Sequence, residues 1–506
     1  MTDLVNRDAD KRGKTIYNVL APCVIGAFFC FLFLFYGIGQ YPDSATYIGY
    51  NTGREPLYPL FLTLCRKLAG KTHFMWAAAL LQNVFAFLAF WYLYCFFVRK
   101  FQLNLLFRIA ALLVILAPHV MTSVFTSSGI VLTNAILSEG LTVSLYPLFA
   151  TLLLEAFYRE KKGWFLAASY MAALLLSLAR GQLMTMLLVW FVVSAVSVVR
   201  GSITGSKMMS GEKKEGDRQA EENQEEGNRA ERTWAKYVCA GTVLVLLAAT
   251  ALGFVLRQAA VRGYHSAMTD GVVQTNTGGN VTLLTNVLYS ADEAAITAAE
   301  ETLSVEDAAL LHNIYAQMRE QGLCASDAGA GFHARILHHE ESHDKIKFGI
   351  LGELLSESVW EEWDMLPEGL LPDGRLMPVE EDYTAGRLMK AVLPHAISGF
   401  LKTYLYVAAG GFVRTVALLS PLFSIYALLI YVVAAALMCY LFMREGSRDV
   451  AWLMAVVLLM IAANVCATAL TIMCLSRYMI YNMTLFYLAG LMCVWEIVKG
   501  RGRKEG

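Results

Sequence analysis

Residues 16–39 read IYNVLAPCVIGAFFCFLFLFYGIG, an apolar run without a charged side chain. A helix needs about 20 mostly apolar residues to cross a bilayer, and this run is long enough. It is too long for the apolar core of a signal peptide, and no small-residue cleavage site follows it. The run therefore predicts a retained membrane anchor at the start of the chain.

The composition of the whole chain also indicates a protein that lies in a lipid bilayer. Of its 506 residues, 57% are hydrophobic and 16% are charged, and the mean hydropathy is +0.49. Soluble domains usually carry about 25% charged residues. Disorder, collagen and a small disulfide scaffold are excluded, and the ten cysteines form no CxxC pair. The formal net charge of -1 gives no nucleic-acid signature.

Ten apolar runs qualify as membrane spans and predict an all-α polytopic membrane protein. The run 164–179 is short, and the run 105–124 is interrupted by Pro118 and His119, so these two have the weakest pattern. The ten predicted spans are residues 16–39, 74–98, 105–124, 139–158, 164–179, 182–199, 237–256, 416–443, 450–473 and 479–498.

The basic residues predict the orientation. With ten spans, the clusters of Lys and Arg all fall on one side of the membrane. Short cytoplasmic loops are enriched in Lys and Arg, so this side is expected to be the cytoplasm, with both termini inside a cell (plasma) membrane. The clusters lie in residues 7–14, 99–108, 159–162, 444–448 and 499–504.

Two long polar segments divide the chain. Ser206–Arg232 mixes charged residues, Gln and Gly, and predicts a disordered cytoplasmic linker. The segment that begins at Arg257 holds aromatic residues and leucines, enough for a small extracytoplasmic domain inserted before the last three spans. The expected organisation is a membrane core at 1–200 with a first outer loop at about 40–72, a linker at 201–234, a span at 235–256, an outer domain at 257–402, membrane helices at 403–498 and a cytoplasmic tail at 499–506.

Several ionisable residues fall at the outer ends of the predicted spans. A single charge there can be an ordinary interfacial side chain, but charges of both signs at one level favour a site at the membrane–water boundary. Arginine grips phosphate oxygens with a planar fork, and a carboxylate among arginines stays ionised and can accept a proton from a hydroxyl. The residues are Asp43, Arg54, Glu55, Glu139, Arg180, Arg477 and Tyr478.

These residues sit in motifs that resemble a known family. The first outer loop, DSATYIGYNTGREPLYPLFLTLCRKLAG at 43–70, is similar to that of the GT-C superfamily of integral-membrane glycosyltransferases. The likeness is greatest to the protein-mannosyltransferase and aminoarabinose-transferase branch, glycosyltransferase family 39. It continues in LSEGL at 137–141, SLARGQ at 177–182 and SRYMIYNMTLFYLAG at 476–490, and leaves out the linker and the outer domain.

The resemblance implies a GT-C-like bundle and an inverting transfer of a sugar from a polyprenyl-phosphate-linked donor on the extracytoplasmic face. Asp43 matches the acidic residue taken as the general base, and Arg54 matches the basic residue that would hold the lipid phosphate. Arg477 with Tyr478 matches a late Arg-Tyr pair that contacts phosphate or sugar. The implied partners are the donor, a glycan, lipid or protein acceptor, and membrane lipid, with no nucleic acid.

The remaining site residues match the family less closely. Glu139 and Arg180 are expected to organise the site. Ser44 follows Asp43 where several members have a second acid, so no cofactor is required, although a divalent metal stays open. Glu55 stands where many members have Pro, which leaves its role undetermined.

A transporter or flippase for lipid-linked sugars is one alternative. A translocation path needs polar residues at mid-membrane depth on several helices. The predicted spans hold few, namely Gln82, Asn83, His119 and Asn464, which ranks this hypothesis below transfer.

An outer-face metalloprotease is the other alternative. His339-Glu340-Glu341-Ser342-His343 fits HExxH, in which two histidines on one helix face bind zinc and the glutamate activates water. His339 and His343 are therefore weak candidate metal ligands. The polar flanks and the richness of this segment in histidine favour a chance match.

A geometric expectation follows for the donor phosphate. Arg54 and Arg477 come from opposite ends of the chain, and both are expected to approach one phosphate at the outer face. The competing expectation is that Arg54 pairs locally with Glu55 and that Arg477 caps a helix end. The identity of the sugar and the acceptor does not follow from the sequence.

Overall fold

The protein is built almost entirely of helices. The computed structural model describes residues 2–49, 54–125, 129–159, 162–209, 218–268, 278–362, 377–444 and 446–502. Within these ranges the chain forms helices and no named strand, apart from one isolated bridge between Gly39 and Ala135. Ten of the helices are long and apolar enough to cross a membrane. The expectation of an all-α, multi-pass membrane protein is confirmed.

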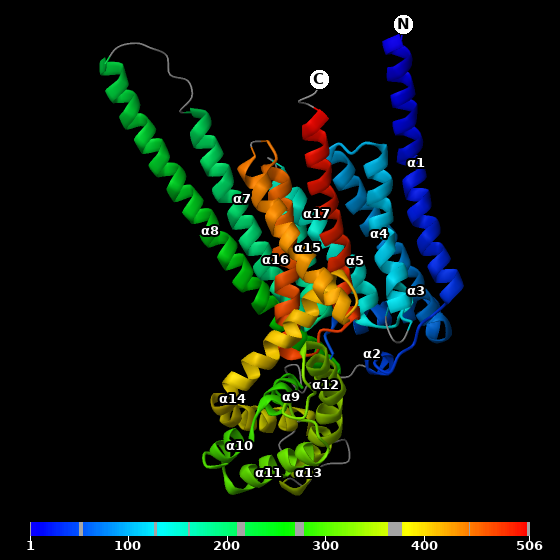
Figure 1. Ribbon diagram of the computed structural model, residues 1–506, viewed down its shortest axis with the longest axis vertical. Helices are drawn as coiled ribbons and strands as arrows, with labels where there is room; N and C mark the ends of the chain where they lie inside the picture. Colours follow the sequence, from blue (N-terminus) through cyan, green and yellow to red (C-terminus); the bar gives the residue numbers. More distant parts are fainter. Residues whose placement is uncertain are drawn as a thin grey trace.

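The first half of the chain forms the helices coloured from blue to teal in Figure 1. Its helices are α1 (Thr2–Tyr36), α2 (Ser44–Ile48), α3 (Leu57–Phe101), α4 (Leu105–Phe125), α5 (Ser138–Tyr158), α6 (Gly163–Ala179) and α7 (Thr185–Met209), with the short 3-10 turns η1 (Leu132–Asn134) and η2 (Gly181–Met184).

The second half adds a long helix, a group of short helices and the closing part of the bundle. These elements are α8 (Arg218–Met268), α9 (Gly279–Ser290), α10 (Glu293–Glu300), α11 (Val305–Glu320), α12 (Phe332–Asp344), the π-helical turn η3 (Lys345–Ile350), α13 (Leu351–Glu362), α14 (Met377–Val416), α15 (Pro421–Met443), α16 (Arg448–Thr471) and α17 (Ser476–Gly502).

Two helices differ from the predicted set of spans. The predicted span 164–179 is α6, which at 17 residues is shorter than the other membrane helices. Conversely, α14 contains an apolar window, Val379–Val416, that qualifies by length and composition. This helix runs across the boundary predicted at 402/403.

The helix ends are arranged at two levels. In Figure 1 the N-terminal end of α1 and the C-terminal end of α17 lie at one end of the bundle, and α9–α13 gather at the other. The short helices have a hydrophobic core of their own, which includes Leu288, Ile314 and Leu355, and α14 contributes Leu388 and Val392 to it. A separate, larger core fills the bundle.

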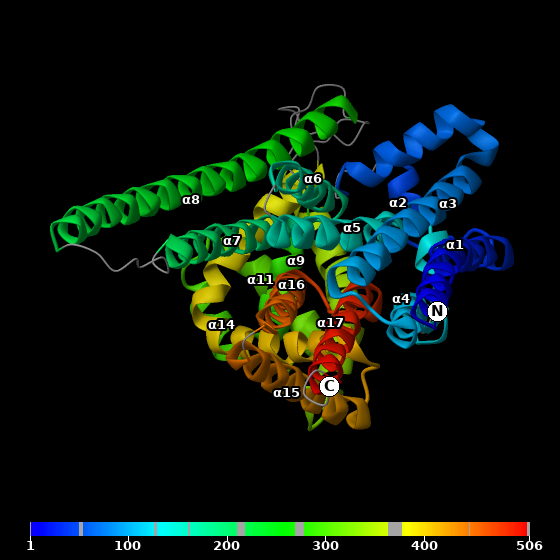
Figure 2. The same cartoon turned by 90° about the horizontal axis from the view of Figure 1, so that it is seen from above.

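The helix α3 consists of two helices joined at a bend. Gly70 has φ +73° and ψ 173° and interrupts the helical geometry, a backbone conformation that costs other residues about 1–3 kcal/mol. The bend separates an entry helix that begins at Leu57 from the membrane span, and Figure 2 shows the change of direction. This entry helix lies within the first-loop motif of residues 43–70.

The chain after α1 is anchored to the loop before α5. Gly39 N–H donates to the Asn134 carbonyl (3.0 Å), and Ile136 N–H donates to the Gly39 carbonyl (2.9 Å). The Asn134 side chain donates to the Leu32 carbonyl at 2.7 Å. Since backbone polar groups must be satisfied inside an apolar environment, these bonds fix the position at which the first loop leaves the bundle.

Helices occupy both ends of the segment predicted as a linker. α7 continues to Met209 and α8 begins at Arg218, whereas the positions 210–217 lie outside the described residues.

Candidate functional site

A carboxylate lies between two arginines at the end of the bundle that faces α9–α13. Arg54 Nη2 is 2.7 Å from Asp43 Oδ1, and Arg477 Nη2 is 3.4 Å from Asp43 Oδ2. Asp43 directly precedes α2, and Arg477 belongs to the first turn of α17. The three side chains are 38%, 28% and 21% exposed, so a ligand can reach them. Asp43 and Arg477, which are 434 positions apart in the sequence, are therefore in contact.

A second, buried carboxylate lies beside the first. Arg180 Nη1 is 2.8 Å from Glu139 Oε1, and Arg477 Nε is 3.6 Å from the same oxygen. Glu139 is 3% exposed and Arg180 is 10% exposed. Arg477 thus bridges both carboxylates. Because Glu139 begins α5 and Arg180 follows α6, their ion pair also shows that α6 returns to the level at which α5 starts.

Aromatic side chains support the guanidiniums. The Arg180 guanidinium carbon is 4.2 Å from the centre of the Tyr478 ring, and that of Arg477 is 4.9 Å away. Arg477 Nη2 also donates to the Tyr478 hydroxyl at 2.7 Å. Arg54 lies 4.6 Å from the centre of the Tyr47 ring. Stacking of this kind orients the planar forks before a ligand binds.

The electrostatic balance of the site is positive. Three guanidiniums, those of Arg54, Arg180 and Arg477, face the two carboxylates of Asp43 and Glu139. Burial alone would raise the pKa of Asp43, but the charges of its arginine neighbours and the hydrogen bond from Arg54 outweigh it and lower that pKa. Asp43 is therefore ionised at neutral pH, and the excess positive charge suits an anionic ligand.

Glu55 is engaged elsewhere. It forms a buried ion pair with Arg257 of α8, whose Nε also donates to the Ser177 carbonyl at 3.3 Å. Gly181 makes room for this pair, because a Cβ at that position would lie 2.7 Å from Glu55 Oε1. Arg54 thus does not depend on its neighbour in sequence, and its guanidinium contacts Asp43 and, at 2.8 Å, the Thr46 hydroxyl.

Two residues that complete the site, Arg257 and Ser138, were not predicted from the sequence. Arg257 was assigned to the outer domain, although a basic residue at the end of the apolar run 237–256 is a natural partner for an acid at the same level. Ser138 belongs to the LSEGL motif at 137–141 but was not predicted as a site residue. Its hydroxyl lies 2.9 Å from Tyr47 Oη and 3.2 Å from Glu139 Oε2.

The short helices α9–α13, with η3, are called the short-helix domain below. The pKa of a lysine in this domain depends in part on charges in the first loop. Burial lowers the pKa of Lys347 in η3, and the charge of Arg54 lowers it further, while Asp344, Asp43 and Asp382 act in the opposite direction. The charges of Asp43 and Arg54 thus influence the pKa of Lys347 in opposite directions.

The polar residues predicted at mid-membrane depth mostly hold loops in place. Gln82 donates to backbone carbonyls in 133–135 at 3.0 Å, and Asn83 donates to the Asn134 side chain in that segment at 2.8 Å. Asn464 donates to a carbonyl at the start of α17 at 3.1 Å. His119 packs between phenylalanine rings whose centres are 4.7 and 5.0 Å away.

The HExxH segment forms part of α12. His339 and His343 are both buried, and their ring centres are 5.9 Å apart. Glu340 makes a two-pronged ion pair with Arg414 of α14, in which one contact measures 2.9 Å. The described residues contain no group of three or more His, Cys, Asp or Glu side chains arranged to hold a metal ion. Glu340 is thus occupied as a partner of Arg414.

Comparison with known proteins adds no relative. No family model matches the chain, and neither a curated protein nor a solved structure does. The likeness to GT-C glycosyltransferases is therefore a resemblance of short motifs. Any assignment of function depends on the geometry around Asp43 and Arg477.

Proposed function

We propose that this protein is a membrane glycosyltransferase that moves a sugar from a polyprenyl-phosphate-linked donor to an acceptor hydroxyl on the extracytoplasmic face. The observation that carries the proposal is the accessible Asp43 carboxylate, held between Arg54 and Arg477. The Asp43 carboxylate can accept a proton, and the guanidiniums of Arg54 and Arg477 can bind a phosphate. Their position at the end of the apolar helices suits a donor with a lipid tail.

The transfer is a single displacement at the anomeric carbon of the donor sugar. The acceptor oxygen attacks this carbon while its proton passes to an oxygen of the Asp43 carboxylate. The bond between the anomeric carbon and the phosphate oxygen breaks, and its electron pair leaves with the polyprenyl phosphate. Attack from the face opposite the phosphate inverts the anomeric configuration.

The two arginines stabilise the charge that develops on the departing phosphate. Hydrogen bonds between guanidinium and phosphate are charge-assisted and are roughly twice as strong as neutral ones. Fixed donors aimed at developing charge lower the barrier to reaction because they need no reorganisation. Arg477 can turn toward a phosphate without stranding Glu139, since Arg180 already contacts that carboxylate at 2.8 Å.

Donor binding also prepares Asp43 for its role as a base. In the empty site the arginines lower the pKa of Asp43, which makes its carboxylate a weak proton acceptor. A phosphate that shares the same guanidiniums adds negative charge beside Asp43, and a neighbouring like charge raises a carboxyl pKa. The donor therefore increases the basicity of Asp43 in the complex in which a proton must be accepted.

The test is a transfer assay with the purified full-length protein in liposomes that contain a polyprenyl-phosphate sugar. Asp43→Asn should lower the transfer rate by at least about 100-fold, the lower end of the usual contribution of a general base. Undiminished transfer by this variant, at equal amounts of inserted protein, would remove Asp43 as the base.

A matched control exists in the same chain. Asp449, at the start of α16, is likewise held by two cations, Lys100 at 2.8 Å and Arg200 at 2.6 Å, and its side chain is 37% exposed. Asp449→Asn therefore removes a carboxylate of similar exposure and pairing outside the proposed site. It should leave transfer unchanged.

The two alternative functions have less to support them. The polar residues at mid-depth are engaged with loop backbone, as Gln82 is with 133–135, instead of forming a continuous path. The glutamate of HExxH, Glu340, is paired with Arg414. Neither feature favours a transporter or a protease over transfer.

A further inference from the structure

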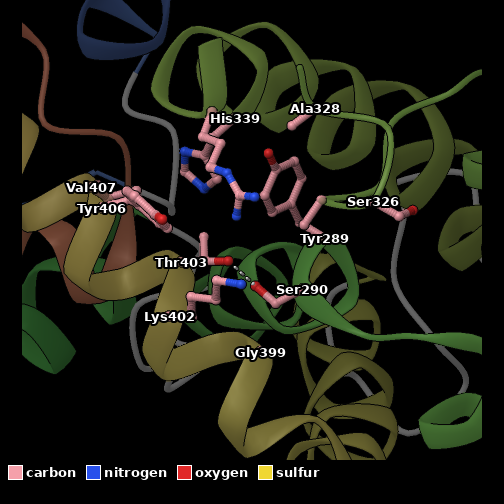
Figure 3. Close-up of a pocket in the computed structure, with 12 residues that line it drawn as sticks. Tyr289, Ser290, Ser326, Ala328, His339, Gly399, Lys402, Thr403, Tyr406 and Val407 are labelled. Carbon is pink, nitrogen blue, oxygen red and sulfur yellow. Dashed lines mark hydrogen bonds between the residues drawn. The ribbon is translucent and has the colours of Figure 1, made fainter. Parts of the chain in front are cut away.

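The short-helix domain contains a cavity that is separate from the Asp43 site. It has a volume of about 300 Å³ and lies between α9, α12, α14 and the loop around Ser326. This volume is at the lower end of the range of small-molecule sites. Figure 3 shows Tyr289 and His339 on one side of the cavity and Thr403 with Lys402 on the other.

Close packing of α9 against α14 shapes this cavity. A Cβ at Gly399 would lie 2.3 Å from the Ser290 carbonyl oxygen, so only glycine allows α14 to approach so closely. Next to this contact, Ser290 Oγ lies 2.9 Å from Thr403 Oγ1, and both hydroxyls line the cavity. The polar surface that Ser290 and Thr403 form in the cavity thus results from the close packing of α9 against α14.

The charge of the cavity wall is positive. Arg335 and Lys402 line it, and no acidic side chain is among the twelve lining residues. The nearest acid in the loop, Asp327, is used by Arg319 at 3.3 Å and by the Cys324 N–H at 3.0 Å. Two cations therefore face a small space without an acidic neighbour on its wall, an arrangement that favours an anionic ligand.

The same wall contains a neutral histidine, His339. Asn286 donates its amide N–H to the Thr471 carbonyl (3.1 Å), which turns its Oδ1 toward His339 Nε2 at 3.0 Å. Burial, together with the charges of His343 and His338, lowers the pKa of His339 to about 3. The neutral ring therefore carries its proton on Nε2, and Nδ1 is buried without a hydrogen-bond partner in the described residues.

We propose that this cavity binds a sugar-sized, hydroxyl-bearing anion, in which a carboxylate or phosphate pairs with Arg335 and Lys402 and the hydroxyls bond to Ser290 and Thr403. Arg335 is oriented for this task, because its guanidinium carbon lies 5.2 Å from the centre of the Tyr406 ring. The inference does not rest on sugar transfer at Asp43, since it concerns binding and is measured without a donor.

The experiment is calorimetric titration of the full-length protein in nanodiscs of neutral lipid. The probes are glucose 6-phosphate, glucuronate, glucose and inorganic phosphate. Glucose 6-phosphate or glucuronate should bind at least about tenfold more tightly than glucose, because charge-assisted contacts are the strong ones. The comparison of these two distinguishes a phosphate from a carboxylate. Either acid should also bind more tightly than inorganic phosphate, which lacks the sugar hydroxyls.

Variants assign the binding to the cavity. Lys402→Ala and Arg335→Ala should each weaken binding of the preferred acid at least about tenfold. Lys390→Ala removes an exposed charge from the same helix without touching the cavity and should leave binding unchanged. Lys402 is exposed, so its loss should not impair folding even if the loss of Arg335 does.

Three results would overturn the proposal. They are no binding by any acidic probe, equal binding of glucose and its acidic relatives, or binding that both cavity variants leave unchanged. Inorganic phosphate that binds as tightly as glucose 6-phosphate would overturn the role of the sugar hydroxyl.

Discussion

Replacement of Arg477 by alanine tests the shared-phosphate reasoning most directly. Arg477 contacts Asp43 at 3.4 Å and Glu139 at 3.6 Å, both longer than a good charge-assisted hydrogen bond. Glu139 keeps Arg180 and Asp43 keeps Arg54 at short distances. The variant therefore leaves no buried charge without a partner, and the protein should fold and insert normally.

The magnitude follows from the contact that is lost to the phosphate. A hydrogen bond to a charged group contributes about 1.5–3 kcal/mol, and Arg477 is only 21% exposed, so solvent screens it incompletely. At about 1.4 kcal/mol per factor of ten, kcat/KM for the donor should fall roughly 10- to 150-fold. Arg477→Lys should recover part of this loss, because the charge returns but the planar fork does not.

The assay is steady-state transfer in liposomes with the concentration of polyprenyl-phosphate sugar varied and the acceptor in excess. Arg200→Ala is the control, since Arg200 pairs with Asp449 away from the proposed site. The reasoning is refuted if Arg477→Ala retains the donor kcat/KM of the parent protein. Full activity of Arg477→Lys would refute the narrower claim that the fork geometry matters.

Further predictions concern stability. The arginine neighbours of Asp43 lower its pKa below 3.8, so this carboxylate stabilises the fold above its unfolded pKa, and the contribution is lost as pH falls through the folded pKa. The difference in Tm between the parent and Asp43→Asn should therefore shrink as the pH falls below about 4. Gly70→Ala should destabilise the protein by about 1–3 kcal/mol through its backbone conformation, whereas Gly490→Ala, in the interior of α17 with open space around it, should not; denaturant titrations compare the two. Arg257→Met should cost about 3–5 kcal/mol because Glu55 stays buried, and adding Glu55→Leu should restore most of the loss; a double-mutant cycle measures the recovery.

The sequence was informative where a property depends on a short stretch of chain. The run 16–39 was identified as a span by length and apolarity alone, and α1 has an apolar window at Val19–Tyr36. The bend at Gly70 lies at the end of the first-loop motif, before the span predicted at 74–98. The boundary predicted at 402/403 lies inside α14, which is helical on both sides of it.

Which charged side chains pair with each other could not be predicted from short stretches of the sequence. Glu55 follows Arg54 in sequence, yet it pairs with Arg257 from α8, because helix packing, and not chain distance, decides which charges meet in an apolar environment. Arg54 is left to share Asp43 with Arg477. A motif can indicate that charges lie at one level of the membrane, but not which of them are in contact.

The sequence by itself determined that this is an all-α membrane protein and which charged residues lie at the ends of its helices. Hydrocarbon excludes unsatisfied backbone, so a sufficiently long apolar run must be helical wherever it packs. Only the tertiary structure decided that Asp43 lies between Arg54 and Arg477, that Lys347 acts on the same loop, and that α9, α12 and α14 enclose a cationic cavity. These features depend on contacts between segments up to 434 residues apart, which side-chain shape and the packing of whole helices select and no local pattern records.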